Sequence, residues 1–216
     1  MTKISKPLVV CVINLKGGVG KSTIAALLAR RAYSQKGKNV LAIDIDPQAN
    51  LSQALMGSRY STFLKKRDPS IVEVFAGYRP PSEKKSSPGS LVASDVTYTV
   101  ASSSGMSLQL IPSRFDFSDN LTQSIRPDPK VLAKFLSAEF HDKDLIIIDC
   151  APVGMISDAI PVGNAVDGTI FAISSQDTNK KDAANCVKLL QRNNVNVLGS
   201  VLTKAKSLSG SHYYYY

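Results

Sequence analysis

Residues 8–23 contain the stretch that decides the fold: Leu8-Val-Val-Cys-Val-Ile-Asn-Leu-Lys-Gly-Gly-Val-Gly-Lys-Ser-Thr23. Its first seven residues form an almost continuous apolar run rich in β-branched side chains, which is typical of a strand buried on both faces. A glycine-rich run follows and leads directly into residues 21–35, where apolar residues recur at helical spacing. The stretch therefore predicts a strand, a glycine loop and a helix in immediate succession.

The rest of the chain repeats this alternation of strands and helices. Further strands are expected at residues 39–44, 108–111, 144–149, 168–174 and 196–202. Further helices are expected at residues 51–56, 71–75, 128–140 and 177–193, with an irregular stretch from 58 to 95. Strands that alternate with long helices imply a doubly wound, mostly parallel sheet with helices on both faces, so the expected fold class is α/β. We expect one domain over residues 1–206 and a flexible Ser/Gly/Tyr tail over 207–216.

Composition excludes several classes of protein. The 216 residues are 44% hydrophobic and 20% charged, which is ordinary globular usage and excludes a disordered chain, a collagen-like repeat and a coiled coil. Three cysteines are too few and too scattered for a disulfide framework or a zinc cluster, which favours a reducing, cytoplasmic compartment. No apolar stretch reaches the length of a membrane span, and the run at 8–15 lacks a signal-peptide cleavage site. We therefore expect no membrane contact.

The net charge of +9 is concentrated in the first part of the chain. Residues 1–56 carry eight Lys/Arg against two Asp, and residues 57–90 carry seven against three acidic residues, whereas residues 91–216 carry eleven against twelve. Such an asymmetry is compatible with a polyanionic partner such as nucleic acid, and equally with an ordinary solvated surface.

The glycine loop has the composition of a phosphate-binding loop. Glycines let successive backbone N–H groups point at phosphate oxygens, and the start of the following helix adds its positive end to the same site. In the general pattern G-x-x-x-x-G-K-[ST], Lys21 reaches the β- and γ-phosphates and the Ser22 hydroxyl binds Mg²⁺. The first glycine of that pattern is replaced here by Leu15, and a second lysine, Lys16, lies just inside the loop.

Three segments together resemble one known family. Asn14-Leu-Lys-Gly-Gly-Val-Gly-Lys-Ser-Thr23 resembles the deviant phosphate loop of the ParA/MinD family of ATPases. Asp44-Ile-Asp-Pro-Gln-Ala-Asn-Leu-Ser52 is similar to the segment after the second strand in the ParA branch, and Leu145-Ile-Ile-Ile-Asp-Cys-Ala-Pro152 to the Walker B strand. The resemblance extends from about residue 8 to residue 202 in the expected order, and it implies a P-loop ATPase that uses ATP and Mg²⁺.

The resemblance implies a role for each residue of the loop. Lys16 matches the signature lysine, which in this family reaches across an ATP-bound dimer to the nucleotide of the partner. Lys21 matches the lysine that binds phosphate in the same subunit, and Ser22 the Mg²⁺ hydroxyl. The expected nucleotide contacts are Lys16, Gly17, Gly18, Val19, Gly20, Lys21, Ser22, Thr23 and Thr203.

The resemblance also assigns the carboxylates. Asp46 matches the residue that orients the attacking water, so Lys16, Lys21 and Asp46 are the expected catalytic residues. Asp149 matches the Walker B carboxylate that holds Mg²⁺ through water. Asp44 is either part of the metal shell or a hydrogen-bond acceptor at the end of its strand. Thr203 falls where the family places adenine contacts.

The family implies an ATP-dependent homodimer that positions plasmid or chromosomal DNA, or another large cargo. Non-specific DNA and a ParB-like partner that stimulates hydrolysis are then expected, with a cytoplasmic location on nucleoid or plasmid. The candidate DNA contacts are basic clusters in the sequence: Lys65-Lys-Arg67, Lys84-Lys85, Lys180-Lys181 and Lys204 with Lys206. Each cluster can equally be a solvated surface.

Two alternatives to DNA positioning stay open. The cluster Tyr213 to Tyr216 is similar to the C-terminal tyrosine run of the bacterial tyrosine kinases, a related group whose members autophosphorylate it. That group lacks the Pro-Gln-Ala-Asn continuation found here after Asp46. The other alternative is an ATP-switched scaffold that does not bind DNA. Neither His141 nor His212 has a Ser or Cys partner at a spacing that indicates a catalytic triad.

Overall fold

The computed structural model describes residues 6–77, 91–114, 128–150 and 159–205, and its seven strands form one sheet in the order β3-β4-β2-β5-β1-β6-β7. All neighbouring strands are parallel except the β3–β4 hairpin. The strands are β1 (Leu8–Asn14), β2 (Val40–Asp44), β3 (Tyr98–Ser103), β4 (Met106–Ile111), β5 (Leu145–Asp149), β6 (Gly168–Ser174) and β7 (Val197–Thr203). This confirms the predicted doubly wound α/β class.

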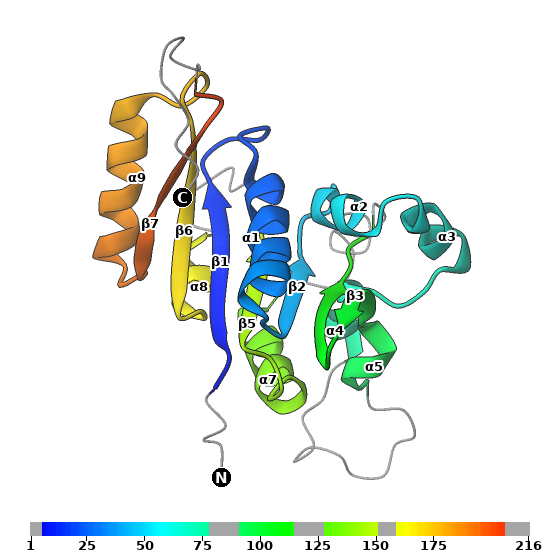
Figure 1. Ribbon diagram of the computed structural model, residues 1–216. Coiled ribbons are helices and arrows are strands. Elements are labelled where there is room, and N and C mark those ends of the chain that lie inside the picture. The colour runs from blue at the N-terminus through cyan, green and yellow to red at the C-terminus, as the bar shows by residue number, and fades with distance from the viewer. Residues whose placement is uncertain (1–5, 78–90, 115–127, 151–158, 206–216) are drawn as a thin grey trace.

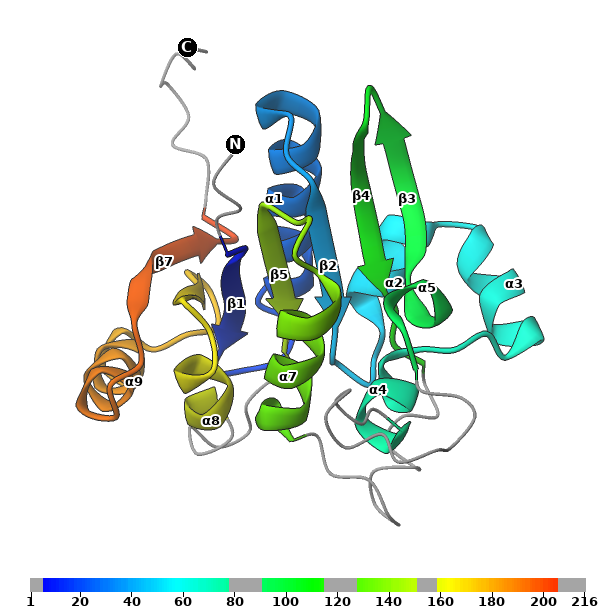
Figure 2. The same ribbon diagram turned by 90° about the horizontal axis from the view of Figure 1, so that it is seen from below.

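Helices cover both faces of the sheet (Figures 1 and 2). Helix α1 packs on one face, together with α2 and α3, while α4, α7, α8 and α9 lie on the other. The helices are α1 (Lys21–Lys36), α2 (Asn50–Met56), α3 (Arg59–Lys66), α4 (Ile71–Gly77), α5 (Ala93–Val96), α7 (Pro129–Glu139), α8 (Ala159–Asn164) and α9 (Lys180–Arg192). Each face therefore has its own apolar core, as expected when a parallel sheet is buried on both sides.

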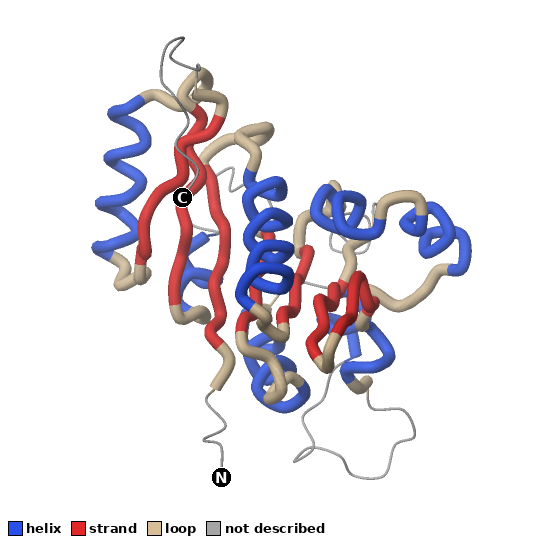
Figure 3. Tube along the Cα trace, viewed as in Figure 1, coloured by secondary structure: helices blue, strands red, loops and turns tan. Residues whose placement is uncertain are grey.

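The stretch from 58 to 95 is more regular than the sequence predicted. It contains α3 and α5, and the strand β3 follows it (Figure 3). Strand β3 was not predicted, because it pairs only with β4 at the edge of the sheet and none of its residues is buried, so its sequence has no apolar run. Helix α8 was not predicted either, since its six residues include a proline and a glycine.

Helix α9 begins three residues later than the sequence suggested. The side chain of Asn179 accepts a hydrogen bond from the Lys181 N–H and so caps the helix at this point. Residues 175–178 form a turn instead, in which the hydroxyl of Ser174, the last residue of β6, accepts hydrogen bonds from the N–H groups of Gln176 and Asp177. This turn lies at the carboxyl end of β6, beside the glycine loop.

The sequence also led to expectations about the cysteines, membrane-spanning helices and the C-terminal tail. All three cysteines are free and buried. Along the described part of the chain, no helix combines the length and apolar character needed to cross a bilayer. The tail at 207–216 lies outside the described residues, so the domain boundary at 206 stays a prediction.

Candidate functional site

The glycine loop connects the carboxyl end of β1 to the start of α1, as the sequence predicted. Gly18 and Gly20 have φ values of +73° and +88°, a region that a residue with a side chain adopts only at an energetic cost. Gly20 is the residue before α1, and no side chain caps that helix. The first N–H groups of α1 are therefore left for a ligand, and an anion is the ligand that they favour.

Two side chains hold the backbone of the loop from outside. The Asn14 amide donates a hydrogen bond to the carbonyl of Lys16, and the Thr203 hydroxyl donates to the carbonyl of Val19 at 2.5 Å. The Cγ2 atom of Thr203 also lies 3.6 Å from the position that a Cβ atom on Gly20 would take. Thr203, which was expected to contact adenine, thus packs against the phosphate loop in this structure. The role of Asn14 was not predicted, because an asparagine at the end of a strand gives no distinctive signal in the sequence.

Lys16 lies on the exposed side of the loop. Its Nζ atom donates a hydrogen bond to the Asp177 carbonyl oxygen at 3.4 Å. The Asp177 carboxylate pairs with Lys204 at 2.6 Å and accepts a hydrogen bond from the Ser174 hydroxyl, and both contacts lower its pKa. One long bond in solvent restrains Lys16 weakly, so its side chain can reach a ligand outside its own loop.

Lys21 lies in a buried cluster with two carboxylates. Its Nζ atom contacts Asp149 Oδ1 and lies 3.5 Å from Asp46 Oδ2, and only 4% of the Lys21 side chain is exposed. Burial alone would lower the pKa of Lys21, but Asp149 and, more weakly, Asp46 together raise it. Burial raises the pKa of Asp149, an effect that Lys21 opposes. Lysine therefore stays charged here, at the point where β1 and β5 lie side by side.

Asp44 is paired in register with Asp149 on the neighbouring strand. Its Oδ2 atom accepts hydrogen bonds from the Ser52 N–H at 2.8 Å and the Ser52 hydroxyl at 2.7 Å, and its Oδ1 atom accepts one from the Asp46 N–H at 3.1 Å. Burial, and then the charge of Asp149, raise the pKa of Asp44 to about 7. The Ser52 hydroxyl in turn accepts a hydrogen bond from the N–H of Ser113, which ties the ends of β2, α2 and β4 together.

The oxygen atoms of the cluster suit Mg²⁺, a hard cation that binds carboxylates, hydroxyls and water. Asp149 Oδ2 is buried and has no hydrogen-bond partner within the described residues, so one acceptor remains available beside Ser22. Asp44, in contrast, has protein donors on both of its oxygen atoms. No group of three His, Cys, Asp or Glu side chains in the described residues is arranged as a metal centre, so water and phosphate would have to complete the coordination.

Among the described residues, the predicted DNA contacts do not form one surface. The exposed residues 65–67 at the end of α3 and the exposed residues 180–181 at the start of α9 lie at opposite ends of the molecule (Figure 1). Lys204 is paired with Asp177. The other candidate DNA contacts, Lys84, Lys85 and Lys206, lie outside the described residues. His212 and the candidate phosphorylation sites Tyr213 to Tyr216 also lie outside them. His141 is exposed after α7.

Comparison with known proteins found a matching family model, similar sequences and similar structures. A family model described as an AAA domain matches residues 8–200. Tyrosine-protein kinase YwqD of Bacillus subtilis (strain 168) is 28% identical over 208 residues, which covers 92% of this chain and 73% of the kinase. A solved plasmid partition protein from Borrelia burgdorferi, bound to AMPPNP, superposes with a TM-score of 0.69 at 20% identity, covering 94% of this chain and 78% of that one.

A second solved structure contains an ATP analogue and magnesium. Cobyrinic acid a,c-diamide synthase from Mycobacterium smegmatis, with an ATP analogue and magnesium bound, superposes with a TM-score of 0.66 at 22% identity. The alignment covers 94% of this chain and 77% of the synthase. At these identities the two solved structures establish the likeness of the fold alone.

Proposed function

The chain belongs to the ParA/MinD-like family of P-loop ATPases, and from this premise we propose that ATP binding joins two copies of it and that hydrolysis separates them. As a member of this family the chain is an ATPase. The buried contact of Lys21 with Asp149 and Asp46, at the start of a helix that no side chain caps, supports ATP binding. The exposure of Lys16 on the outside of the loop carries the proposal that two copies join.

Lys21 binds the β- and γ-phosphates. In the ligand-free chain its charge is balanced by Asp149 and Asp46, and phosphate oxygens would take over part of that role. Ser22 and Asp149 would then be released to hold Mg²⁺, directly and through water, and the cation would neutralise charge on the phosphates. The backbone N–H groups of the loop and the first turn of α1 complete the grip.

Asp46 orients the attacking water. Its Oδ1 atom is held by the Gln48 N–H at 2.9 Å, and its backbone N–H is held by Asp44. Asp44 is therefore assigned as a strand-end acceptor that positions Asp46, rather than as a metal ligand. Lys16, exposed on the outside of the loop, supplies its charge to the phosphates bound by the partner copy, where it stabilises the transition state.

The Lys16→Ala variant should bind ATP nearly as tightly as the native chain but should not form the ATP-dependent dimer. The phosphate contacts of Lys21 and the loop are unchanged, whereas the charge that reaches the partner is lost. Nucleotide affinity can be measured by fluorescence titration and the dimer by light scattering with ATP. The variant Lys36→Ala, which removes an exposed lysine at the other end of α1, is the control. A Lys16→Ala chain that dimerises and turns over ATP normally would contradict the proposed role.

The Thr203→Val variant tests whether Thr203 acts on the loop or on the base. Valine keeps the shape but loses the hydrogen bond to the Val19 carbonyl, so the affinity for ATP, ADP and GTP should fall by a similar factor of about three to ten. The matched control is Thr203→Ser, which keeps the hydroxyl. An effect confined to the adenine nucleotides would mean that Thr203 contacts the base, as the family resemblance implies.

The output of the cycle is the positioning of DNA or another large cargo. A dimer would carry two copies of each basic cluster, which supports tighter binding to the phosphate backbone in the ATP-bound state. A salt titration on random-sequence duplex, with ATP and with ADP, tests this: the ATP form should bind more tightly, with a log–log slope of about −0.9 for each phosphate contact. Equal or absent binding in both states would favour a scaffold without DNA. A ParB-like partner remains part of the proposal.

Tyrosine autophosphorylation is the second candidate, favoured by the 28% identity to a tyrosine-protein kinase over most of the chain. In that reaction the γ-phosphate would pass to a tyrosine hydroxyl instead of water. Incubation with γ-labelled ATP separates the two candidates, because the label appears either on protein tyrosine or as free phosphate. Replacement of Tyr213 to Tyr216 by phenylalanine would remove the protein-bound label and leave the hydrolysis unchanged.

A further inference from the structure

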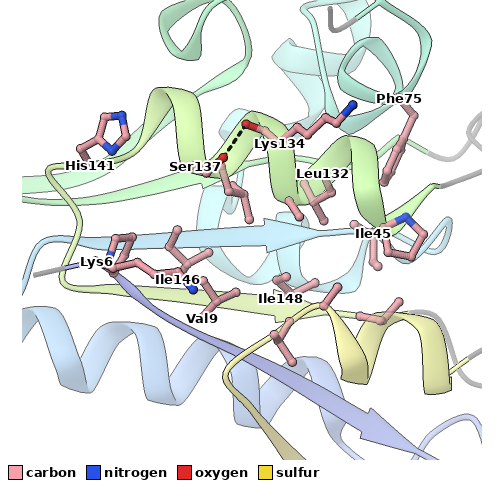
Figure 4. Close-up of a pocket in the computed structure, with 17 residues that line it drawn as sticks. Lys6, Val9, Ile45, Phe75, Leu132, Lys134, Ser137, His141, Ile146 and Ile148 are labelled. Atoms are coloured by element: carbon pink, nitrogen blue, oxygen red, sulfur yellow. Dashed lines mark hydrogen bonds between the residues drawn. The ribbon is translucent and has the colours of Figure 1, made fainter. Parts of the chain in front are cut away.

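An apolar groove of about 650 Å³ lies between α7 and α8, on the opposite face of the sheet from α1 (Figure 4). We call it the α7–α8 groove. Its floor is formed by strand residues, Val9 of β1 with Ile146 and Ile148 of β5, and Leu132 and Val162 contribute to its helical walls. The volume is that of a site for a small organic molecule, and no residue of the phosphate loop lines it.

The ionisable side chains that line the groove are, among the described residues, all basic. Lys6, Lys134 and His141 line it, and none of the described lining residues is an aspartate or a glutamate. Figure 4 places Lys6 and His141 at the same end, near Ile146. Lys6 pairs with Asp167 at 3.3 Å, but its side chain is 75% exposed, and an ammonium group has three protons to donate. An anion at this end would therefore meet donors that can turn toward it.

We propose that the α7–α8 groove binds a single-chain amphiphile with a carboxylate head, that is, a free fatty acid. The hydrocarbon chain lies over the strand floor, where burial of apolar surface favours it. The carboxylate remains at the end of the groove with Lys6 and His141. A purely apolar ligand would make no use of this basic end, and a small anion would gain nothing from the apolar floor.

The groove lies directly behind the carboxylate cluster of the ATP site. Ile45, between Asp44 and Asp46, lines it, and Ile148 of the floor immediately precedes Asp149. Successive side chains of a strand point to opposite faces, so a ligand in the groove contacts the rear of β5 while Asp149 points to the loop. Occupancy of the groove should therefore change the rate of ATP turnover.

Calorimetric titration of the whole chain with octanoate, decanoate and dodecanoate, below their micelle concentrations and without nucleotide, tests the binding. Affinity should rise about fourfold for each added CH₂ group, as expected for hydrocarbon transferred from water. Dodecanol, which has the same chain but no charge, should bind about threefold to tenfold more weakly than dodecanoate. Absence of binding by dodecanoate, or equal binding of the alcohol, would overturn the proposal.

The Ala133→Phe variant locates the site. Ala133 is exposed on α7 and lines the groove, and the matched control Ala184→Phe makes the same change at an exposed position of α9 that does not. The first should weaken dodecanoate binding at least tenfold and the second should not change it. Equal binding to Ala133→Phe would contradict the location. Self-association that Ala133→Phe abolishes, without any binding of dodecanoate, would identify the groove as an interface between copies and overturn the proposal.

The coupling to the ATP site has its own readout. Saturating dodecanoate should change the ATP turnover of the native chain and of Ala184→Phe, but not that of Ala133→Phe. Turnover that does not respond although calorimetry shows binding would contradict the coupling. Because the calorimetric arm uses no nucleotide, its result does not depend on the proposed ATP-dependent dimer.

Discussion

Replacement of Asp46 by asparagine should lower the rate of ATP turnover by about 100- to 1,000-fold while ATP still binds. Asparagine keeps the size of the side chain and can still accept the hydrogen bond from the Gln48 N–H. It loses the negative charge that would hold and polarise the attacking water. Lys21 keeps Asp149 as its partner, so the grip on the phosphates is largely preserved.

The Asp46→Asn chain should therefore accumulate as the ATP-bound dimer. Single-turnover release of phosphate measures the rate, and light scattering with ATP measures the dimer. The control is Asp182→Asn, because Asp182 is an exposed carboxylate on α9. Loss of ATP binding in Asp46→Asn would show instead that the 3.5 Å contact with Lys21 is needed to form the phosphate site.

The sequence predicted the parts of the fold that are governed by burial. Strands β1, β2, β5 and β6 are each almost entirely buried, so their apolar runs are unbroken and their limits could be predicted to within one residue. Strand β3 has no such run, because it lies at the edge of the sheet. Short helices such as α3 and α8 depend on tertiary packing, and a pattern of three or four apolar residues does not distinguish them from loops.

The sequence indicated residues that the structure brings together, but it did not indicate their contacts. The order of β2, β5 and β1 in the sheet brings Asp44, Asp149 and the loop together, and the resemblance to a family supplied those residues. The Ser52 hydroxyl donates a hydrogen bond to Asp44 and accepts one from the Ser113 N–H. Both bonds depend on how α2 packs, and no fixed spacing in the sequence indicates them. The hydrogen bond from Thr203 to the Val19 carbonyl could not be predicted either, because the two residues are 184 positions apart in the sequence.

The free energy of unfolding of the ligand-free chain should fall as the pH rises from about 4 to about 7. Asp44 has a pKa of about 7 in the folded chain, against 3.8 for an ordinary aspartate. Between these values the folded chain keeps a proton that the unfolded chain has released, so each increase in pH favours unfolding. At about 1.4 kcal/mol per pH unit, the loss due to Asp44 amounts to about 4 kcal/mol and is complete above pH 7. The raised pKa of Asp149 acts in the same direction.

The Asp44→Asn variant should remove most of this slope. Asparagine carries no titrating proton, and its amide oxygen can still accept one of the hydrogen bonds from Ser52. Urea unfolding at pH 5 and pH 7.5, without nucleotide or Mg²⁺, measures the difference in the native chain, in Asp44→Asn and in the exposed control Asp182→Asn. The native chain and the control should lose stability toward pH 7.5, whereas Asp44→Asn should lose far less. An unchanged slope in Asp44→Asn would mean that Asp44 is already ionised at pH 5, because its hydrogen bonds with Ser52 and Asp46 then outweigh its burial.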